Sequence, residues 1–201
     1  MAYFAAILIG YLLGCSNMAL YLSKAKGVDL RSGGSGNLGA SNTVTMIGWS
    51  AGIITAIHDI SKAILAVFLA RFLFPDAEHI GLLAGVSSIY GHIFPFYLKF
   101  RGGKGLASYV GLMLALNWKF GLVVMVMIGV ITLVTDFIVL GTTATVIVAP
   151  VYAFLALGLI PMLVLIPISL IMLWKHKDNY IRIYNCQELG LSKKRHGLFK
   201  K

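Results

Sequence analysis

Ile138–Leu157 reads IVLGTTATVIVAPVYAFLAL, an apolar stretch that no charged side chain interrupts. A helix needs about 20 such residues to cross the hydrocarbon core of a bilayer, so this segment has the length and composition of a membrane span. The 201-residue chain contains several similar stretches; it is 59% hydrophobic, with a mean hydropathy of +0.88. Only 12% of its residues are charged, well below the roughly 25% usual in soluble domains. The sequence therefore predicts an all-α, polytopic membrane helix bundle.

Seven segments have the apolar character of membrane helices, but the fourth is short and the fifth is marginal, so a five-span bundle is an open alternative. The predicted spans are Ala2–Ser23, Ile47–Phe74, His79–Tyr97, Gly105–Leu116, Phe120–Thr135, Ile138–Leu157 and Leu159–Trp174. The first lacks a basic leader and a small-residue cleavage site, so we expect a retained span rather than a signal peptide. We expect residues 1–188 to form one integral-membrane domain, followed by a basic cytoplasmic tail at 189–201.

The distribution of cations predicts the orientation, because cytoplasmic loops of membrane proteins are enriched in Lys and Arg. The connection between the second and third spans holds Asp76 and Glu78 but no Lys or Arg. Cations follow the first and third spans, and the segment from residue 175 to the end carries eight Lys or Arg against two carboxylates. The N-terminus is therefore predicted outside and the C-terminus inside. The tail is most simply a positive-inside tail near anionic headgroups, and nucleic-acid binding is disfavoured because no fold presents the patch.

Arg31–Asn42, RSGGSGNLGASN, is the first polar segment, and it consists almost entirely of small residues. Backbone N–H groups together with the side chains of Ser35, Asn37, Ser41 and Asn42 would form a nest for phosphate oxygens. The same composition is also typical of a flexible turn rich in helix-capping residues. Both interpretations stay open at this point.

Gly91–Gly105, GHIFPFYLKFRGGKG, is the second polar segment, and it combines glycines, a histidine and three cations at the end of a span. Glycine lets a backbone approach phosphate oxygens closely, and Pro95 should stop or kink the preceding helix. The likeness of Gly102–Gly105 to an ATP-binding P-loop is superficial, because the upstream strand and the first-glycine spacing are absent. His92 is either a capping residue at a helix end or part of a site beside the glycine–lysine loop.

His176–Glu188, HKDNYIRIYNCQE, is the third polar segment. In a helix, Asn179 and Arg182 share one face at i, i+3 spacing, and a juxtamembrane amphipathic helix is the alternative. Asp59 and Lys62 have the same spacing inside the second span, where unpaired charges are costly, so we expect an intrahelical ion pair. Cys15 and Cys186 are too far apart to predict a disulfide, and no metal-ligand cluster is visible.

The three segments, with KGVDLR and HDISKA beside them, resemble the motifs of the bacterial acyl-phosphate:glycerol-3-phosphate acyltransferase (PlsY) family. The resemblance runs from the first span to Glu188. It implies transfer of a fatty acyl group from acyl phosphate, not acyl-CoA, to the 1-position of sn-glycerol 3-phosphate, which forms lysophosphatidic acid. It also implies a multi-pass enzyme of the bacterial cell membrane with a cytoplasmic active site. We expect no cofactor and no metal, and the soluble enzyme that forms acyl phosphate is a candidate partner.

The resemblance also assigns residues to each motif. The catalytic candidates are His92, Asn179 and Ser35. The substrate- and phosphate-binding candidates are Ser35, Gly36, Asn37, Gly39, Asn42, Gly102, Gly103, Lys104, Gly105, Arg182 and Glu188, and Gly91 and Pro95 complete the second motif. Two positions depart from the family pattern: Thr45 stands where an arginine is common, and Cys186 where a glycine is expected. Loss of a charge-assisted phosphate contact would weaken binding by roughly 1.5–3 kcal/mol, unless Arg31, Arg101 or Arg182 compensates.

An acyl phosphate already has a good leaving group, so such an enzyme must position both reactants, neutralise charge and accept one proton. His92 is the conventional candidate for the base, because imidazole titrates near neutral pH; the donor's phosphate could also accept the proton. A covalent acyl-Ser35 intermediate is disfavoured, since no nucleophile elbow or Ser–His–Asp order is present. The alternatives are a diverged paralogue with another acceptor or reduced activity, and a phosphate- or lipid-binding transporter. No internal repeat of the kind found in transporters is visible.

Overall fold

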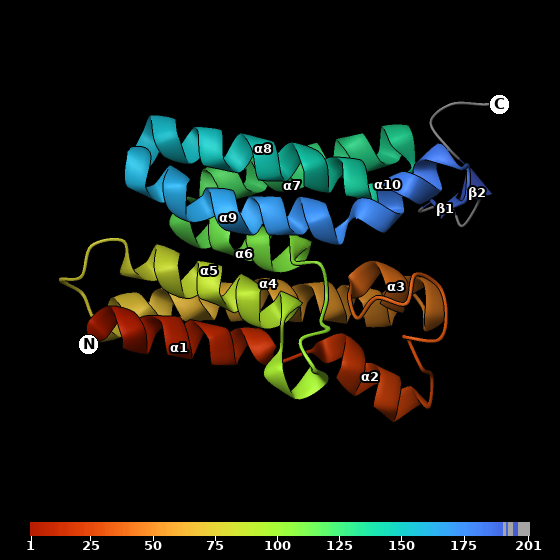
Figure 1. Ribbon diagram of the computed structural model, residues 1–201, viewed down its shortest axis with the longest axis horizontal. Coiled ribbons are helices and arrows are strands. Elements are labelled where there is room, and N and C mark those ends of the chain that lie inside the picture. The colour runs from red at the N-terminus through yellow and green to blue at the C-terminus, as the bar shows by residue number, and fades with distance from the viewer. Residues whose placement is uncertain (191, 193–194, 197–201) are drawn as a thin grey trace. The chain divides into compact units, whose positions relative to one another are not determined.

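Helices form almost all of the regular structure in the computed structural model, which describes residues 1–190, 192 and 195–196 (Figure 1). Its contacts divide the chain into two compact units, Met1–Gly121 (unit 1) and residues from Leu122 onward (unit 2). Unit 1 contains α1 (Ala2–Cys15), α2 (Met18–Lys26), α3 (Ala40–Met46), α4 (Trp49–Leu73), α5 (Ile80–Ile93), the 3-10 helix η1 (Phe96–Leu98), α6 (Leu106–Leu116) and the start of α7 (Trp118–Thr135). The all-α prediction is confirmed.

Unit 2 contains the rest of α7 and three further helices, of which α8 and α9 pack against each other. These helices are α8 (Ile138–Leu157), α9 (Leu159–Lys175) and α10 (Lys177–Tyr184). A short antiparallel pair, β1 (Glu188–Leu189) and β2 (Arg195–His196), follows. The predicted basic tail falls largely on residues 191, 193–194 and 197–201, which lie outside the described residues.

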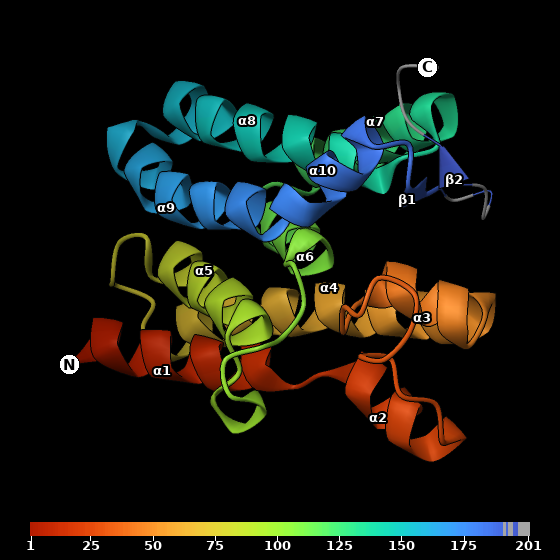
Figure 2. The same cartoon turned by 45° about the vertical axis from the view of Figure 1, so that its right-hand side comes forward.

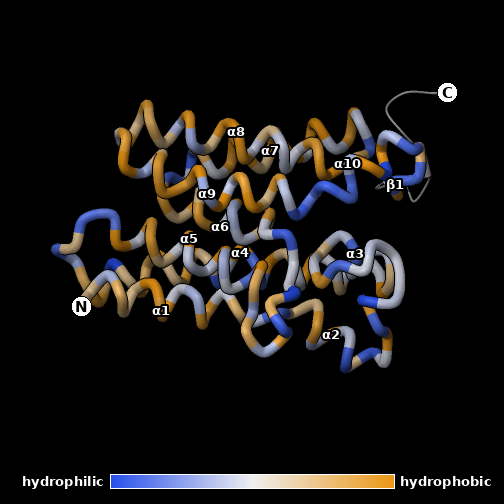
Figure 3. The backbone as a smooth tube through the Cα atoms, in the orientation of Figure 1, coloured by the Kyte–Doolittle hydropathy of each residue, from blue (hydrophilic) through white to orange (hydrophobic). Residues whose placement is uncertain are grey.

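Five stretches among the described residues are long and apolar enough to cross a membrane: Ala2–Lys26, Trp49–Leu73, Ile80–Leu98, Trp118–Thr135 and Ile138–Leu157. A sixth candidate is Leu159–Lys175 joined to Lys177–Tyr184 through a bend of 43°. The short fourth predicted span is the helix Leu106–Leu116, whose 11 residues do not reach across a bilayer alone. Figure 3 shows hydrophobic colours along the helices and hydrophilic colours in many of their connections. The count of seven and the orientation stay predictions.

The first predicted span, Ala2–Ser23, corresponds to the candidate span Ala2–Lys26, but its helix is interrupted between Cys15 and Met18. Asn17 caps α2, and its side-chain Oδ1 accepts a hydrogen bond from Leu20 N at 2.8 Å. In an unbroken helix Leu20 N would donate to the carbonyl of Ser16, so the cap releases that carbonyl. Ser16 O instead accepts a hydrogen bond from Lys62 Nζ at 2.8 Å. The break between α1 and α2 therefore presents a backbone acceptor to a cation on α4.

Close packing of α1 on α5 fixes the position of the second motif. A Cβ on Gly10 would lie 2.1 Å from Ala84 O, and one on Gly14 would lie 2.0 Å from Ser88 O, so only glycine allows this approach. Small residues four apart are a common device for bringing membrane helices together. In Figures 1 and 2, α1, α4 and α5 lie side by side within unit 1. α5 ends at Ile93, as the following Pro95 predicted.

Candidate active site

A buried polar cluster joins α4, α5 and the break after α1. Lys62 Nζ lies 2.8 Å from Asp59 Oδ1, which confirms the predicted i, i+3 ion pair. Lys62 Nζ also makes a 2.9 Å hydrogen bond with His92 Nδ1. All three side chains are at most 5% exposed. His92 is therefore held in the interior rather than being a surface cap at the end of α5.

The glycine loop of the second motif folds back over His92. Gly103 N donates to His92 O at 3.1 Å, and Gly102 N donates to Ile93 O at 3.0 Å. A Cβ on Gly103 would lie 2.0 Å from His92 Nε2, so the imidazole faces the Cα of this glycine directly. Gly105 has φ +96°, a backbone conformation that favours glycine, and it is the N-cap of α6. The structure thus brings His92, Gly102, Gly103 and Gly105 together.

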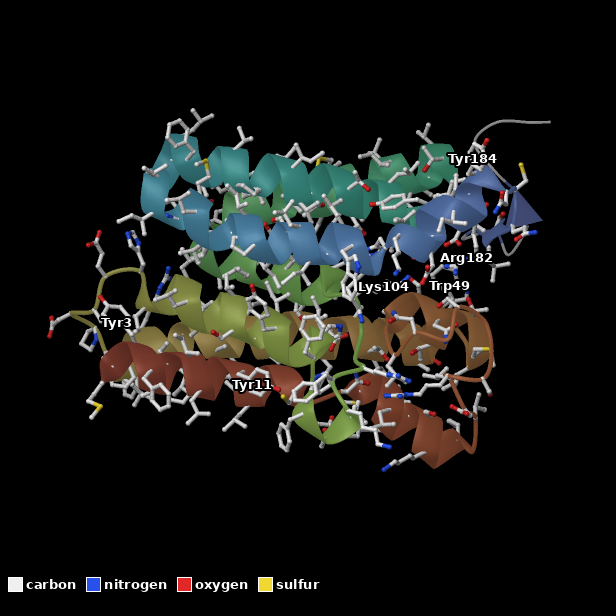
Figure 4. All side chains as sticks on the ribbon, viewed as in Figure 1. Tyr3, Tyr11, Trp49, Lys104, Arg182 and Tyr184 are labelled. Atoms are coloured by element: carbon white, nitrogen blue, oxygen red, sulfur yellow. The ribbon has the colours of Figure 1, made fainter. Side chains whose placement is uncertain are left out.

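Lys104 stands in this same loop, between Gly103 and Gly105, and its side chain is half-buried (Figure 4). Its backbone position places a cation beside the segment that contacts His92. Phe96, Tyr97 and Phe100, on the preceding turn, are exposed. An exposed aromatic group at the end of a span is typical of the membrane interface.

The loop of the first motif is ordered by Asn42, which is 2% exposed. Its Oδ1 accepts from Ser35 N at 2.8 Å, and its Nδ2 donates to Leu30 O at 2.8 Å. Ser35 and Gly36 are exposed, Asn37 is half-buried, and Gly39 is buried as the residue that precedes α3. Asn42 therefore shapes the loop, whereas Ser35 and Gly36 remain accessible on it.

A hydrogen bond ties the two glycine-rich loops together. The guanidinium Nη2 of Arg31 donates to the backbone carbonyl of Arg101 at 2.8 Å, across 70 residues of sequence. Within unit 1 the first and second motifs thus lie next to each other.

The third motif lies in unit 2 and forms its own network. Asn179 Nδ2 donates to Glu188 Oε1, and Arg182 Nε donates to Glu188 Oε2, each at 2.5 Å. Asn179 and Arg182 share a face of α10, as predicted, and Glu188 fixes both side chains from β1. From their sequence and the predicted orientation, we expect the three motifs to converge on one side of the membrane, which stays a prediction.

His176 was missed as a functional candidate, although it opens the third segment. It is 5% exposed, and its Nδ1 lies 2.7 Å from Met172 O. A carbonyl only accepts hydrogen bonds, so Nδ1 carries the proton, and in the neutral ring Nε2 carries the lone pair. Only the contact with Met172 O reveals this, because a histidine four residues beyond a methionine has no special meaning in sequence.

The two departures from the family pattern have clear local structures. Cys186 has φ +56°, a left-handed conformation that glycine adopts without strain. Thr45 is half-buried on α3, and its hydroxyl donates to Ser41 O at 3.1 Å, within the same helix. Among the described residues, no three His, Cys, Asp or Glu side chains are grouped so that they could hold a metal ion.

Comparison with known proteins gives one consistent result. A family model described as glycerol-3-phosphate acyltransferase matches residues 4–186. Glycerol-3-phosphate acyltransferase 1 of Oceanobacillus iheyensis is 35% identical over 199 residues, covering 96% of each chain. The glycerol-3-phosphate acyltransferase of Coxiella burnetii is 34% identical, covering 91% of this chain and 95% of its own.

Two crystal structures of PlsY, an integral membrane glycerol 3-phosphate acyltransferase, have the same fold as this chain. The glycerol 3-phosphate form has a TM-score of 0.88 at 26% identity and covers 95% of this chain and 96% of its own. The lysophosphatidic acid form has a TM-score of 0.84, also at 26% identity, with coverage of 96% and 98%.

Proposed function

The chain belongs to the glycerol-3-phosphate acyltransferase (PlsY) family of integral membrane proteins, and we propose that acyl phosphate is its donor. The acyl group passes to the 1-position of sn-glycerol 3-phosphate, and the products are lysophosphatidic acid and inorganic phosphate. The resemblance of the three motifs to those of the acyl-phosphate-dependent enzymes supports this donor. The solved relatives support the acceptor and the product, because they carry glycerol 3-phosphate and lysophosphatidic acid.

The observation that carries the proposal is the hydrogen bond from Arg31 to Arg101 O. It holds two loops of small residues and cations next to each other, and both reactants of the proposed reaction are phosphorylated. Backbone N–H groups of such loops bind phosphate oxygens, and nearby cations neutralise their charge. Two loops of this kind therefore fit a reaction with two phosphate groups better than a reaction with one phosphate group.

Each motif then has a role in binding. Ser35, Gly36, Asn37 and Gly39 offer one loop to a phosphate, with Asn42 shaping that loop. Gly102, Gly103, Lys104 and Gly105 offer the other, and the Lys104 ammonium supplies the charge. In the third motif Asn179 orients the glycerol hydroxyl, Arg182 adds a further cation, and Glu188 positions both.

The chemistry is an acyl transfer between two oxygen atoms. The 1-hydroxyl oxygen attacks the acyl carbonyl carbon, the C–O bond to phosphate breaks, and phosphate leaves with the bonding electron pair. The hydroxyl proton passes to His92 or to the donor's phosphate. Hydrogen-bond donors and cations stabilise the negative charge that develops on the carbonyl oxygen. We propose no acyl-Ser35 intermediate, and trapping one would contradict this scheme.

We also propose a bacterial plasma-membrane location with the site open to the cytoplasm. The cations of both glycine loops support it through the positive-inside bias. The soluble enzyme that makes acyl phosphate is the partner expected on that side.

The direct test is acyl transfer by purified protein with radiolabelled glycerol 3-phosphate. We expect labelled lysophosphatidic acid with acyl phosphate and none with acyl-CoA. Product formed equally well from acyl-CoA would refute the proposed donor. In sealed vesicles, uptake of label without lipid product would instead favour a transporter. Full turnover by His92→Ala would exclude a role of His92 in the reaction, whether it accepts the proton or orients the glycerol hydroxyl.

A further inference from the structure

Lys62 is a buried cation whose surroundings come from three separate parts of unit 1. Its ammonium donates to Ser16 O at 2.8 Å at the helix break and lies 2.8 Å from Asp59 Oδ1. The contact with Asp59 is ionic, because Oδ1 has no hydrogen-bond partner among the described residues. The third neighbour is His92 Nδ1 at 2.9 Å. The same ring nitrogen lies farther from Asp59 Oδ1, at 3.4 Å. A carboxylate and a backbone carbonyl both favour the charged ammonium, which is otherwise costly at this depth.

Of the two groups near Nδ1, only the ammonium makes a contact with hydrogen-bond geometry, because Asp59 Oδ1 has no hydrogen-bond partner among the described residues. A charged ammonium has only hydrogens to offer, so its contact fixes the state of the imidazole. Nδ1 must accept this hydrogen bond and therefore carries the lone pair. The neutral ring then has its proton on Nε2, the nitrogen that faces Gly103. We propose that Lys62 is a positioning residue, held by Asp59 and the Ser16 carbonyl, which locks His92 in the Nε2–H tautomer and aims that proton at the glycine loop.

The Nε2–H group has no hydrogen-bond partner within the described part of the chain, and Nε2 is not among the fully buried unpaired atoms, although His92 as a whole is only 4% exposed. This donor is therefore accessible, and an oxygen of an anion bound on the adjacent loop would pair with it. His92 therefore donates to a phosphate or carbonyl oxygen of a reactant, rather than accepting a proton through Nε2. This assignment rests on the proposed acyl transfer, because it gives His92 a reactant to contact.

The break between α1 and α2 supports a dedicated role for Lys62. Ion pairing with Asp59 needs only i, i+3 spacing on one helix, yet the chain also interrupts α1 to provide the Ser16 carbonyl. Pairing alone would leave the ammonium free to rotate, whereas the added carbonyl directs it toward α5. The three contacts define one orientation of Nζ and thus one orientation of the ring.

The tautomer can be measured directly by nitrogen-15 NMR of histidine-labelled protein in nanodiscs. Protonated and unprotonated ring nitrogens have well-separated nitrogen-15 chemical shifts. The chain has five histidines, and the signals of His92 are identified as those that disappear in His92→Asn. We expect His92 at neutral pH to show a proton on Nε2 and none on Nδ1. A proton on Nδ1, or on both nitrogens, would overturn the proposal. This measurement needs no variant of Lys62 to fold.

The kinetic test compares two cations of α4. In Lys62→Met we expect the single His92 tautomer to become a mixture. We also expect kcat to fall about 10- to 100-fold with little change in the KM of either substrate, because a misplaced ring stabilises the transition state less. Arg71→Met is the matched control, since Arg71 also donates from α4 to a carbonyl, that of Ala115 at 3.2 Å. It should leave the His92 signals unchanged.

The outcomes distinguish the positioning role of Lys62 from the proposed acyl transfer. An unchanged His92 spectrum and unchanged kcat in Lys62→Met would refute the positioning role, and a loss of the tautomer in Arg71→Met would show a general packing effect instead. If wild-type protein transfers no acyl group from acyl phosphate, the proposed function fails, while the tautomer measurement still decides the role of Lys62.

Discussion

Asn42 and Ser35 are joined by a 2.8 Å hydrogen bond in which the Asn42 side-chain Oδ1 accepts from the Ser35 backbone N–H. The same amide donates through Nδ2 to Leu30 O at 2.8 Å and to Gly33 O at 3.3 Å. One buried side chain thus organises both limbs of the first glycine-rich loop. This loop is therefore ordered by hydrogen bonds, and phosphate binding on it stays a prediction.

Replacement of Asn42 by Ala should disorder this loop. It removes three hydrogen bonds and leaves buried carbonyls without donors, a cost of about 1–3 kcal/mol in unfolding free energy. We also expect a higher KM for glycerol 3-phosphate, because Ser35 loses its anchor. Thermal unfolding in detergent and steady-state kinetics measure both effects. Ser50→Ala, at an exposed position in the first turn of α4, is the control; equal effects of the two changes would contradict the account.

Gly103→Ala should abolish most activity with little loss of stability. The new methyl would lie 2.0 Å from His92 Nε2, so either the imidazole or the loop must move. A displacement of about 1 Å at a reacting centre costs on the order of 100-fold in rate. Acyl-transfer kinetics of the purified variant measure it.

Gly129→Ala is the matched glycine replacement, because a Cβ there would have no heavy atom within 4 Å. It should retain wild-type kinetics. Normal activity in Gly103→Ala would show that the close approach of Gly103 to His92 has no catalytic importance.

The sequence predicted features that depend on local patterns. Apolar stretches located the helices, i, i+3 spacing located the pair of Asp59 and Lys62, and Pro95 located the end of α5. It missed the break after α1, where Asn17 caps α2 and the released Ser16 carbonyl binds Lys62, 46 residues farther along the chain; this last contact has no local pattern. The hydrogen bond from Lys62 to His92 spans 30 residues and has no local pattern either.

The helix α3 was also missed, since its sequence ASNTVTM contains β-branched and polar residues that are poor helix formers. Its Asn42 and Thr43 are buried against the preceding loop, so tertiary packing overrides propensity there. The polar motifs themselves could be identified from sequence, because glycine and charge are unusual in such an apolar chain. Their contacts could not, because these depend on how the helices pack.

Cys186→Gly should stabilise unit 2. A side chain at φ +56° carries roughly 1–2 kcal/mol of left-handed strain, which exceeds the roughly 0.5–1 kcal/mol that glycine loses through a more flexible unfolded chain. We expect a net gain of about 0.5–1 kcal/mol in the free energy of unfolding, measured by chemical denaturation. Cys186→Ala keeps the strain and removes the thiol, so it should give no gain; an equal gain would rule out the backbone explanation.

Thr45→Arg should strengthen binding of glycerol 3-phosphate. Thr45 follows Asn42 by three residues on α3 and therefore lies near the same face as the residue that shapes the phosphate loop. Its hydroxyl is bonded within its own helix, to Ser41 O, so replacement breaks no contact with another element through that group. A new charge-assisted contact contributes about 1.5–3 kcal/mol, which corresponds to a KM lower by about 10-fold or more.

Thr45→Gln supplies similar length without charge and should leave KM near its original value. If arginine and glutamine behave alike, the phosphate does not reach this position, and Arg31 or another cation has taken over the role that the family gives to this arginine.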